Sequence, residues 1–207
     1  MEDSNDAFYG FCYNQRFYVV LSQDGKPSEL GVRLVDEIVK MLKDKKKMEQ
    51  WILKLRESKI VFEESIPTKE DIQKFKNIIT EQHDKTNWTF LDDYYSYYKS
   101  LDKILSLGVI LNSISPQGHP LVAPYGYVLN FDEKRFDIYI EHTRIDSLED
   151  KYGTQVPILK EKIDLTDLNR QSFQRIVDKF ERGIVSESSE GEEETDLEVS
   201  EGESDVE

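Results

Sequence analysis

The chain has 207 residues, a net charge of −15 and one cysteine, Cys12, which excludes an internal disulfide and a zinc site made of several thiolates. No stretch approaches the ~18 apolar residues of a membrane span, and residues 1–7 are acidic and polar, unlike a signal peptide. We therefore expect an intracellular protein of the cytoplasm or nucleus, or of a host cell interior or virion if viral, with no membrane partner.

The negative charge is concentrated at the C-terminal end. Residues 186–207 contain 11 acidic residues and no Lys or Arg. Taking these from the 42 acids of the chain leaves 31 against 27 Lys and Arg, a net charge of −4 for the remainder. The body is therefore nearly balanced, with no wide basic face, and we expect no direct nucleic-acid binding.

The N-terminal third predicts a hairpin followed by helical structure. Aromatic and β-branched residues at 8–13 and 17–21 flank a short polar turn, as in a β-hairpin. Apolar residues then recur at helical spacing from Leu30 to Leu42 and again from Met48 to Leu55. The basic stretch 43–47 interrupts this stripe, so one long helix or two shorter ones are expected.

The middle of the chain predicts short strands and capped helices. Residues 59–62 and 109–111 have the composition of short strands. Thr68 is the expected N-cap of a helix, with Asp71 completing a capping box. The buried face of that helix should contain Ile72, Phe75, Ile78 and Ile79. The Tyr-rich segment 88–107 should end in a helix stopped by Gly108.

The C-terminal third contains the clearest β-hairpin. Residues 125–131 and 136–140 flank a charged turn, and 156–163 should add an edge strand, since Pro157 lies near its start. Thr166 should cap a final helix that Gly183 ends. The expected inner face of that helix consists of Leu168, Phe173, Ile176, Val177 and Phe180.

These elements predict an α+β protein with an antiparallel sheet built from two hairpins, packed helices and a disordered acidic C-terminal tail. Hairpins are separated by helices without the regular βαβ alternation of a parallel sheet. The expected organisation is a flexible N-terminus at 1–7, a single α+β domain at 8–183 and the acidic tail at 184–207.

Several motifs in the same order resemble an uncharacterised family of small proteins in fungi and large DNA viruses, over about residues 8–145. The resemblance rests on Tyr18-Val19-Val20, Pro27-x-x-Leu30-Gly31-Val32, Pro67-Thr68-x-x-Asp71-Ile72, Trp88, the run from Ser100 to Leu105 and the run from Tyr127 to Asp132. The chain departs from the family at Lys26-Pro27, where a Tyr-Pro is commoner, and in a Tyr-rich insertion. The family has no established activity, so the resemblance implies no catalytic residues.

Cys12, Asp92 and Asp93 are the candidate catalytic residues. Cys12 would need a neighbouring base to act as a nucleophile, and it lies in an aromatic strand, where free cysteines usually act as small hydrophobes. The three histidines, at 83, 119 and 142, lack the close spacing of metal ligands. We therefore predict no metal site and no cofactor.

The tyrosines that follow Asp93 are candidate partner-binding residues. Tyr94, Tyr95, Tyr97 and Tyr98 could line a pocket or a partner surface, because a phenol combines apolar area with a polar group. The alternative, which we favour, is that half of them pack on the core while the others extend along its edge.

The acidic tail carries the strongest functional signal. Its carboxylates, Glu192, Glu193 and Glu194 among them, could engage basic proteins, or they could serve only solubility. Each of four hydroxyls has Glu three residues downstream, the pattern read by acidophilic kinases. These candidate phosphorylation sites are Ser189, Thr195, Ser200 and Ser204. The lysines at 43–47 are an ordinary solvated helix surface or a docking site for the chain's own tail.

Three functional hypotheses follow. The first is a non-enzymatic interaction protein, adaptor or structural, whose acidic tail contacts basic partners through residues 186–207. The second is an enzyme of unknown class with a pocket between the first hairpin and the Tyr-rich segment. The third is mimicry of nucleic acid by the tail. The sequence does not set the oligomeric state.

Overall fold

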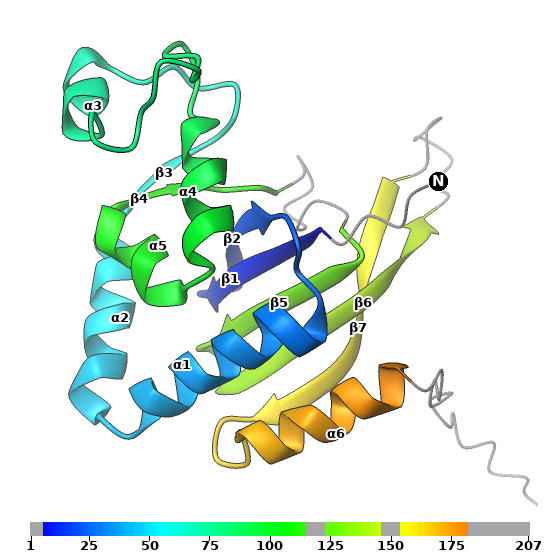
Figure 1. Ribbon diagram of the computed structural model, residues 1–207. Coiled ribbons are helices and arrows are strands. Elements are labelled where there is room, and N and C mark those ends of the chain that lie inside the picture. The colour runs from blue at the N-terminus through cyan, green and yellow to red at the C-terminus, as the bar shows by residue number, and fades with distance from the viewer. Residues whose placement is uncertain (1–5, 115–122, 146–153, 182–207) are drawn as a thin grey trace, which may run out of the picture.

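The computed structural model describes residues 6–114, 123–145 and 154–181, with backbone alone at 141–145, 154–157 and 180–181. The acidic tail, Gly183, His119 and most of the N-terminal segment 1–7 lie outside these residues. A five-stranded sheet in the order β2-β1-β5-β6-β7 forms the centre (Figure 1). Within the described ranges, no helix is both long and apolar enough to cross a membrane.

The first predicted hairpin is confirmed. Strands β1 (Ala7–Tyr13) and β2 (Arg16–Ser22) pair in antiparallel register across a two-residue turn. The turn residues Asn14 and Gln15 have φ of 50° and 60°. Two consecutive left-handed residues are what the right-handed twist of a tight hairpin requires.

The sheet is mixed, which corrects part of the sequence prediction. Strands β5 (Tyr125–Asn130), β6 (Arg135–Ile145) and β7 (Thr154–Asp164) continue the antiparallel pairing, and β7 is the expected edge strand. β1, however, pairs with β5 in parallel, with Ala7 opposite Tyr125. A parallel pair needs a long connection, and the helices between the two hairpins supply it.

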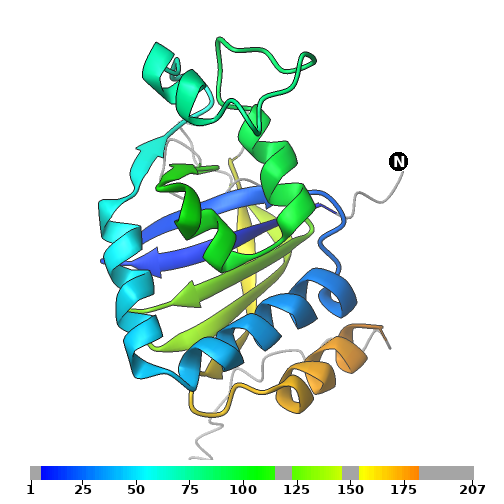
Figure 2. The same cartoon turned by 60° about the vertical axis from the view of Figure 1, so that its left-hand side comes forward.

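All helices that contribute to the main core lie on one face of the sheet (Figure 2). The β1 side chains alternate accordingly: Tyr9 and Phe11 face the helices, while Phe8 and Cys12 belong to a smaller cluster on the opposite face. Tyr9 and Tyr127 are fully buried, and each phenol donates to a backbone carbonyl, so burial leaves no polar atom of theirs unpaired.

The interrupted apolar stripe forms two helices joined at Lys43 and Asp44. The π-turn η1 (Pro27–Gly31) leads into α1 (Val32–Leu42), and α2 (Lys45–Glu57) follows after a corner. Asp44 is extended, and its carboxylate accepts the Lys46 backbone N–H. This N-cap ends one helix and begins the next.

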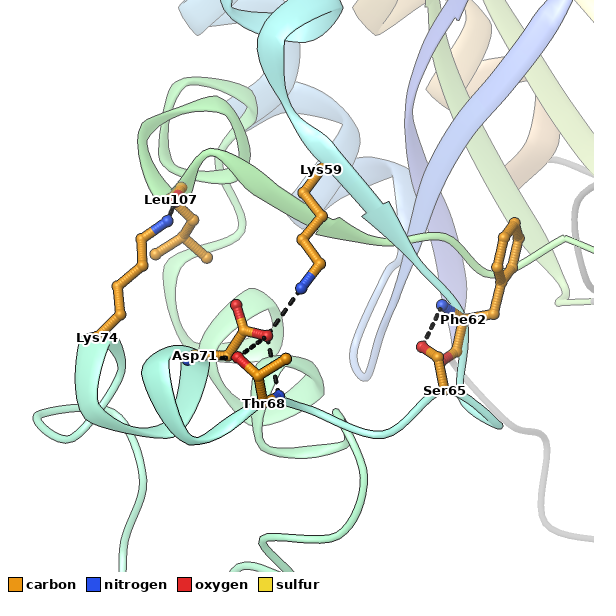
Figure 3. Close-up of polar contacts among 7 residues, drawn as sticks. All are labelled: Lys59, Phe62, Ser65, Thr68, Asp71, Lys74 and Leu107. Carbon is orange, nitrogen blue, oxygen red and sulfur yellow. Dashed lines mark hydrogen bonds and ion pairs between the residues drawn. The ribbon is translucent and has the colours of Figure 1, made fainter.

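A second, two-stranded sheet of β3 (Lys59–Val61) and β4 (Val109–Leu111) lies beside α3 (Lys69–Lys74). The predicted capping box of Thr68 and Asp71 is confirmed. Figure 3 shows the Asp71 carboxylate also accepting a bond from Lys59 Nζ at 2.7 Å. Burial alone would raise the pKa of Asp71, but the bonds from Lys59 and Thr68 outweigh it and hold that pKa below its usual value.

The predicted inner face of the helix at Thr68 is confirmed only in part, because Ile72, Ile78 and Ile79 pack against the core without being fully buried. The helix ends at Lys74, one residue before Phe75, and none of its own residues is buried. Phe75 is buried, against Trp88 and Phe90, whereas Ile72 is only half-buried, like Ile78 and Ile79. Lys74 bonds the Leu107 carbonyl at 3.0 Å (Figure 3) and so ties the end of α3 to α5 (Leu101–Leu107).

The Tyr-rich segment forms two helices, α4 (Phe90–Tyr98) and α5, and Gly108, left-handed at φ 65°, ends α5 as expected. The final helix, α6 (Arg170–Glu181), begins later than predicted. Asn169 caps it, because its side chain accepts the Ser172 N–H while the Ser172 hydroxyl accepts the Asn169 N–H. Thr166 is therefore not the cap. The described inner face holds Leu168, Phe173, Ile176 and Val177, all buried.

Candidate functional site

A cavity of about 250 Å³ lies between the end of the first hairpin and α4. Three carboxylates line it, from Asp6, Asp92 and Asp93, together with the hydroxyls of Ser22 and Ser96. The remaining lining residues are Leu21, Gln23 and Ala123. No Lys, Arg or His belongs to this described lining, so the charged residues of the lining itself are all acidic.

The first turn of α4 presents the acidic side chains to this cavity. Asp92 and Asp93 lie where carboxylates are favoured by the helix dipole, and Ser96 follows Asp92 by about one helical turn. The Ser96 hydroxyl accepts the Gln23 backbone N–H at 3.3 Å. This bond attaches α4 to the end of β2 and fixes one wall of the cavity.

Asp92 has an unusual ionisation. Burial raises its pKa to about 6, and the negative charges of Glu63 and Asp93 add to the effect. A carboxyl group with a pKa near neutrality can donate or accept a proton at physiological pH. Asp92 is thus the described cavity residue best suited to general acid or base chemistry.

Asp93 is held by His83, a contact that the sequence did not predict. The Thr80 backbone N–H donates to His83 Nδ1 at 2.9 Å, which leaves the ring proton on Nε2. Nε2 then donates to Asp93 Oδ2 at 2.8 Å. Both ring nitrogens are engaged, so His83 orients a carboxylate and offers no free nitrogen as a base.

The structure separates Cys12 from this cavity. Its side chain packs in the cluster of Phe8, Val19 and Tyr139. Cys12 lies at the turn end of the first hairpin, whereas the cavity lies at the other end of the hairpin, beside Ser22. Burial and the neighbouring Asp132 carboxylate raise the pKa of the Cys12 thiol to about 11, so it stays protonated. As a nucleophile Cys12 is disfavoured, and a structural role fits its surroundings.

The four candidate tyrosines have different environments. Tyr95 is in the core, where its hydroxyl donates to the Val109 carbonyl and accepts the Leu111 N–H. The proposal that Tyr95 binds a partner is therefore wrong, because its side chain is only 1% exposed. Tyr97 is 78% exposed, Tyr98 is 36% exposed and Tyr94 is half-buried.

The three remaining tyrosines form one aromatic surface on α4. The Tyr98 ring lies 4.5 Å from the Tyr94 ring and 4.9 Å from the Tyr97 ring, between centroids. Lys103 Nζ already lies over the Tyr98 ring at 5.1 Å. We call Tyr94, Tyr97 and Tyr98 the tyrosine surface.

The sequence indicated two of the three acidic residues of the cavity, Asp92 and Asp93, but not Asp6 or the other lining residues. Ser96 had a signal, its spacing of four residues from Asp92 on a predicted helix. Asp6, Ser22 and Gln23 had none, because the sheet and α4 bring them together. Among the described residues, no group of three or more His, Cys, Asp or Glu is arranged to hold a metal ion.

The predicted tail residues Glu192, Glu193 and Glu194 lie outside the described residues, as do Ser189, Thr195, Ser200 and Ser204. Comparison of the chain with protein-family models, with curated proteins and with solved structures found no match. The family resemblance therefore stays a prediction.

Proposed function

We propose that this is a non-enzymatic interaction protein, an adaptor or structural protein of the cell interior, whose acidic tail engages basic partners. The observation that carries the proposal is the charge distribution. Residues 186–207 contain 11 acidic residues and no Lys or Arg, whereas the rest of the chain has a net charge of only −4. Such a segment attracts basic proteins over about a Debye length, ~8 Å at physiological ionic strength.

The described surface supports the same partner class. Asp93, with a side chain 79% exposed, and Tyr97 lie on α4 beside the acidic cavity. Carboxylates and exposed aromatic rings both attract the cationic groups of Lys and Arg. The tyrosine surface and the cavity thus offer a basic segment a second contact on the body.

Phosphorylation would strengthen the tail's contribution. Ser189, Thr195, Ser200 and Ser204 precede acidic residues at the spacing that acidophilic kinases recognise. Each phosphate adds about −1.5 to −2 charges at neutral pH. We therefore expect phosphorylated protein to bind basic partners more tightly.

A fluorescent peptide rich in Lys and Arg tests the proposal directly. Its affinity is measured by anisotropy for the full chain, for the chain truncated after Gly183, and for a full-length variant with every acid of 186–207 changed to its amide. We expect both changes to weaken binding by at least about tenfold, ~1.4 kcal/mol, and rising salt to weaken binding to the full chain. Unchanged affinity in both variants overturns the role of the tail.

The contribution of α4 is tested on the same peptide with a Tyr97→Ser, Asp93→Asn double variant of the full chain. We expect a further loss of about threefold, ~0.7 kcal/mol. The matched control is an Ile66→Ser, Glu64→Gln double variant, which also removes an exposed apolar side chain and an exposed carboxylate but lies outside α4. An equal effect of the two variants argues against binding at the tyrosine surface.

The second candidate function is an enzyme using the cavity, and the raised pKa of Asp92 favours it specifically. A cavity of about 250 Å³ with a proton donor and two hydroxyls could hold a small polar molecule. A panel of small amines, sugars and nucleosides tests this by thermal shift. A ligand that raises the melting temperature of the native chain but not of Asp92→Asn supports the enzyme; no such ligand in the panel counts against it.

A further inference from the structure

Five lysines gather where α1 ends and α2 begins, and we call them the lysine corner: Lys40, Lys43, Lys45, Lys46 and Lys47. Four of them are exposed and Lys47 is half-buried. The tail proposal and the α4 cavity do not involve this part of the fold. Figure 2 shows the α1–α2 junction at the lower end of the molecule, away from α3.

The corner breaks a local electrostatic rule. The first turn of α2 contains Lys45, Lys46 and Lys47 and no acidic residue. The N-terminus of a helix has a partial positive charge, so cations there are unfavourable and carboxylates are preferred. Where a residue is locally unfavourable and no interaction within the fold offsets it, a functional role is the expected reason for its presence.

No such gain is present in the described part of the chain. None of the ion pairs among those residues includes a lysine of the corner. The Asp44 carboxylate accepts the Lys46 backbone N–H at 3.0 Å as the N-cap, and the carboxylates of Asp36 and Glu49 lie one helical turn from Lys40 and Lys45 without forming an ion pair with either lysine. The corner therefore presents a concentrated positive charge to solvent.

The acidic tail starts within reach of this charge. α6 packs antiparallel to α1: Arg170, its first residue, lies 4.0 Å from Asp36, and Phe173 lies against Gly31. From this contact the two helices run in opposite directions, with eleven residues to Glu181 along α6 and seven to Lys43 along α1. At 1.5 Å per helical residue, Glu181 and Lys43 are therefore ~27 Å apart along the helix axes. The eleven residues from Glu181 to Glu192 extend to ~36 Å, which is enough.

We propose that the acidic tail docks on the lysine corner of its own chain. The tail fits the corner by charge, since residues 186–207 contain only acidic charged residues, whereas residues 40–49 contain five lysines against Asp44 and Glu49, a net charge of 5 − 2 = +3. Docking within one chain is also favoured by the covalent linkage, because a segment on a short linker is present near its site at an effective millimolar concentration. A docked tail cannot bind basic partners, so the lysine corner would regulate the binding proposed above. This regulation rests on the proposed role of the tail.

Paramagnetic relaxation in the full chain tests docking. A nitroxide is attached at Ser200→Cys, with Cys12→Ala so that the label has one site, and amide signals are recorded at low and high salt. We expect broadening at residues 43–48 that disappears at high salt. It should also disappear in the triple variant Lys43→Glu, Lys45→Glu, Lys46→Glu. It should persist in the matched triple Lys69→Glu, Lys76→Glu, Lys85→Glu, which has equal charge and lies around α3.

Two further measurements keep the outcomes distinct. Labelled protein mixed with unlabelled isotope-enriched protein should show no broadening; broadening there assigns the corner to the tail of a second copy and overturns intramolecular docking. The peptide affinity should rise about two- to fivefold more in the corner triple than in the matched triple, as the freed tail becomes available. If the labelled full chain shows no broadening, and the peptide affinity of the corner triple equals that of the matched triple, docking is rejected. The proposed binding of the tail to basic partners would be unaffected by that result.

Discussion

The Asp132 carboxylate accepts the backbone N–H of Gln15 at 2.8 Å, although the two residues belong to the turns of different hairpins. Its other oxygen accepts the Asn14 N–H at 2.9 Å. The first turn has two left-handed residues whose N–H groups point outward, and the second hairpin supplies the anion that binds them. This contact fixes the ends of β1 and β5 side by side.

We expect Asp132→Ala to lower the free energy of unfolding by about 1–2 kcal/mol, because two N–H groups lose a charged acceptor and turn to water. Urea unfolding measures the change. The control is Glu133→Ala in the same turn, with a side chain 62% exposed and only a 3.9 Å contact to Arg135; it should cost less than about 0.5 kcal/mol. Equal losses in the two variants would contradict the assignment.

Gln15→Gly should stabilise the protein. Gln15 has φ of 60°, a conformation that costs a side chain about 1 kcal/mol and that glycine adopts freely. We expect a gain of about 0.5–1 kcal/mol in unfolding free energy. The same substitution at exposed Gln50, inside α2, should cost about 1 kcal/mol. A loss at both positions would show that the turn does not need its left-handed geometry.

Glu37→Ala should destabilise the contact between α1 and α5. The Glu37 carboxylate accepts the Ser100 hydroxyl and the backbone N–H groups of Leu101 and Asp102, at 2.8–2.9 Å. It thus caps a helix distant in sequence, and its removal should cost about 2–3 kcal/mol. Asp36→Ala, at the adjacent position, where the side chain is 43% exposed and makes only a 4.0 Å ion pair with Arg170, should cost about 0.5 kcal/mol or less. Thermal and urea unfolding of both variants provide the comparison.

Asp92→Asn should change how stability depends on pH. The folded-state pKa of Asp92 is about 6, above the unfolded value near 3.8. The folded state therefore binds the extra proton between about pH 4 and pH 6, and stability falls as pH rises through that window. The Asp92→Asn variant has no carboxyl group here to ionise, so its stability does not fall in this way. Its free energy of unfolding, relative to that of the native chain, should therefore rise across the window by about 1–2 kcal/mol, allowing for partial exposure. A carboxyl NMR titration of Asp92 should give a midpoint near 6; one near 4 would contradict the burial argument.

Local signals in the sequence predicted local structure well. The alternating apolar residues of the first hairpin, the capping box of Thr68 and Asp71, and the stop at Gly108 depend on neighbours a few residues away, and all three are confirmed. The cap of α6 was wrong because Thr166 and Asn169 both suit an N-cap, and only Asn169 has Ser172 at the reciprocal position.

Long-range relationships were not predictable in the same way. Nothing near Ala7 in the sequence indicates that it pairs in parallel with Tyr125, because hydrophobic alternation sets the face of a strand and not its neighbour. The composition around Asp92 identified an unusual segment, but the cavity forms only when α4 meets β2. Tyr95 was misassigned for a related reason: one helix buries one tyrosine and exposes the next, and the packing partner decides which.

The parallel pairing of β1 with β5 also has a consequence for biosynthesis. Cys12 pairs with Asn130, so the ribosome must translate 118 more residues before the inner edge of β1 finds its neighbour. At about 5–20 residues per second, this takes roughly 6–24 s. Throughout that interval the nascent first hairpin presents an aromatic, unpaired strand to the cell. We therefore expect this strand to be a binding site for chaperones during translation.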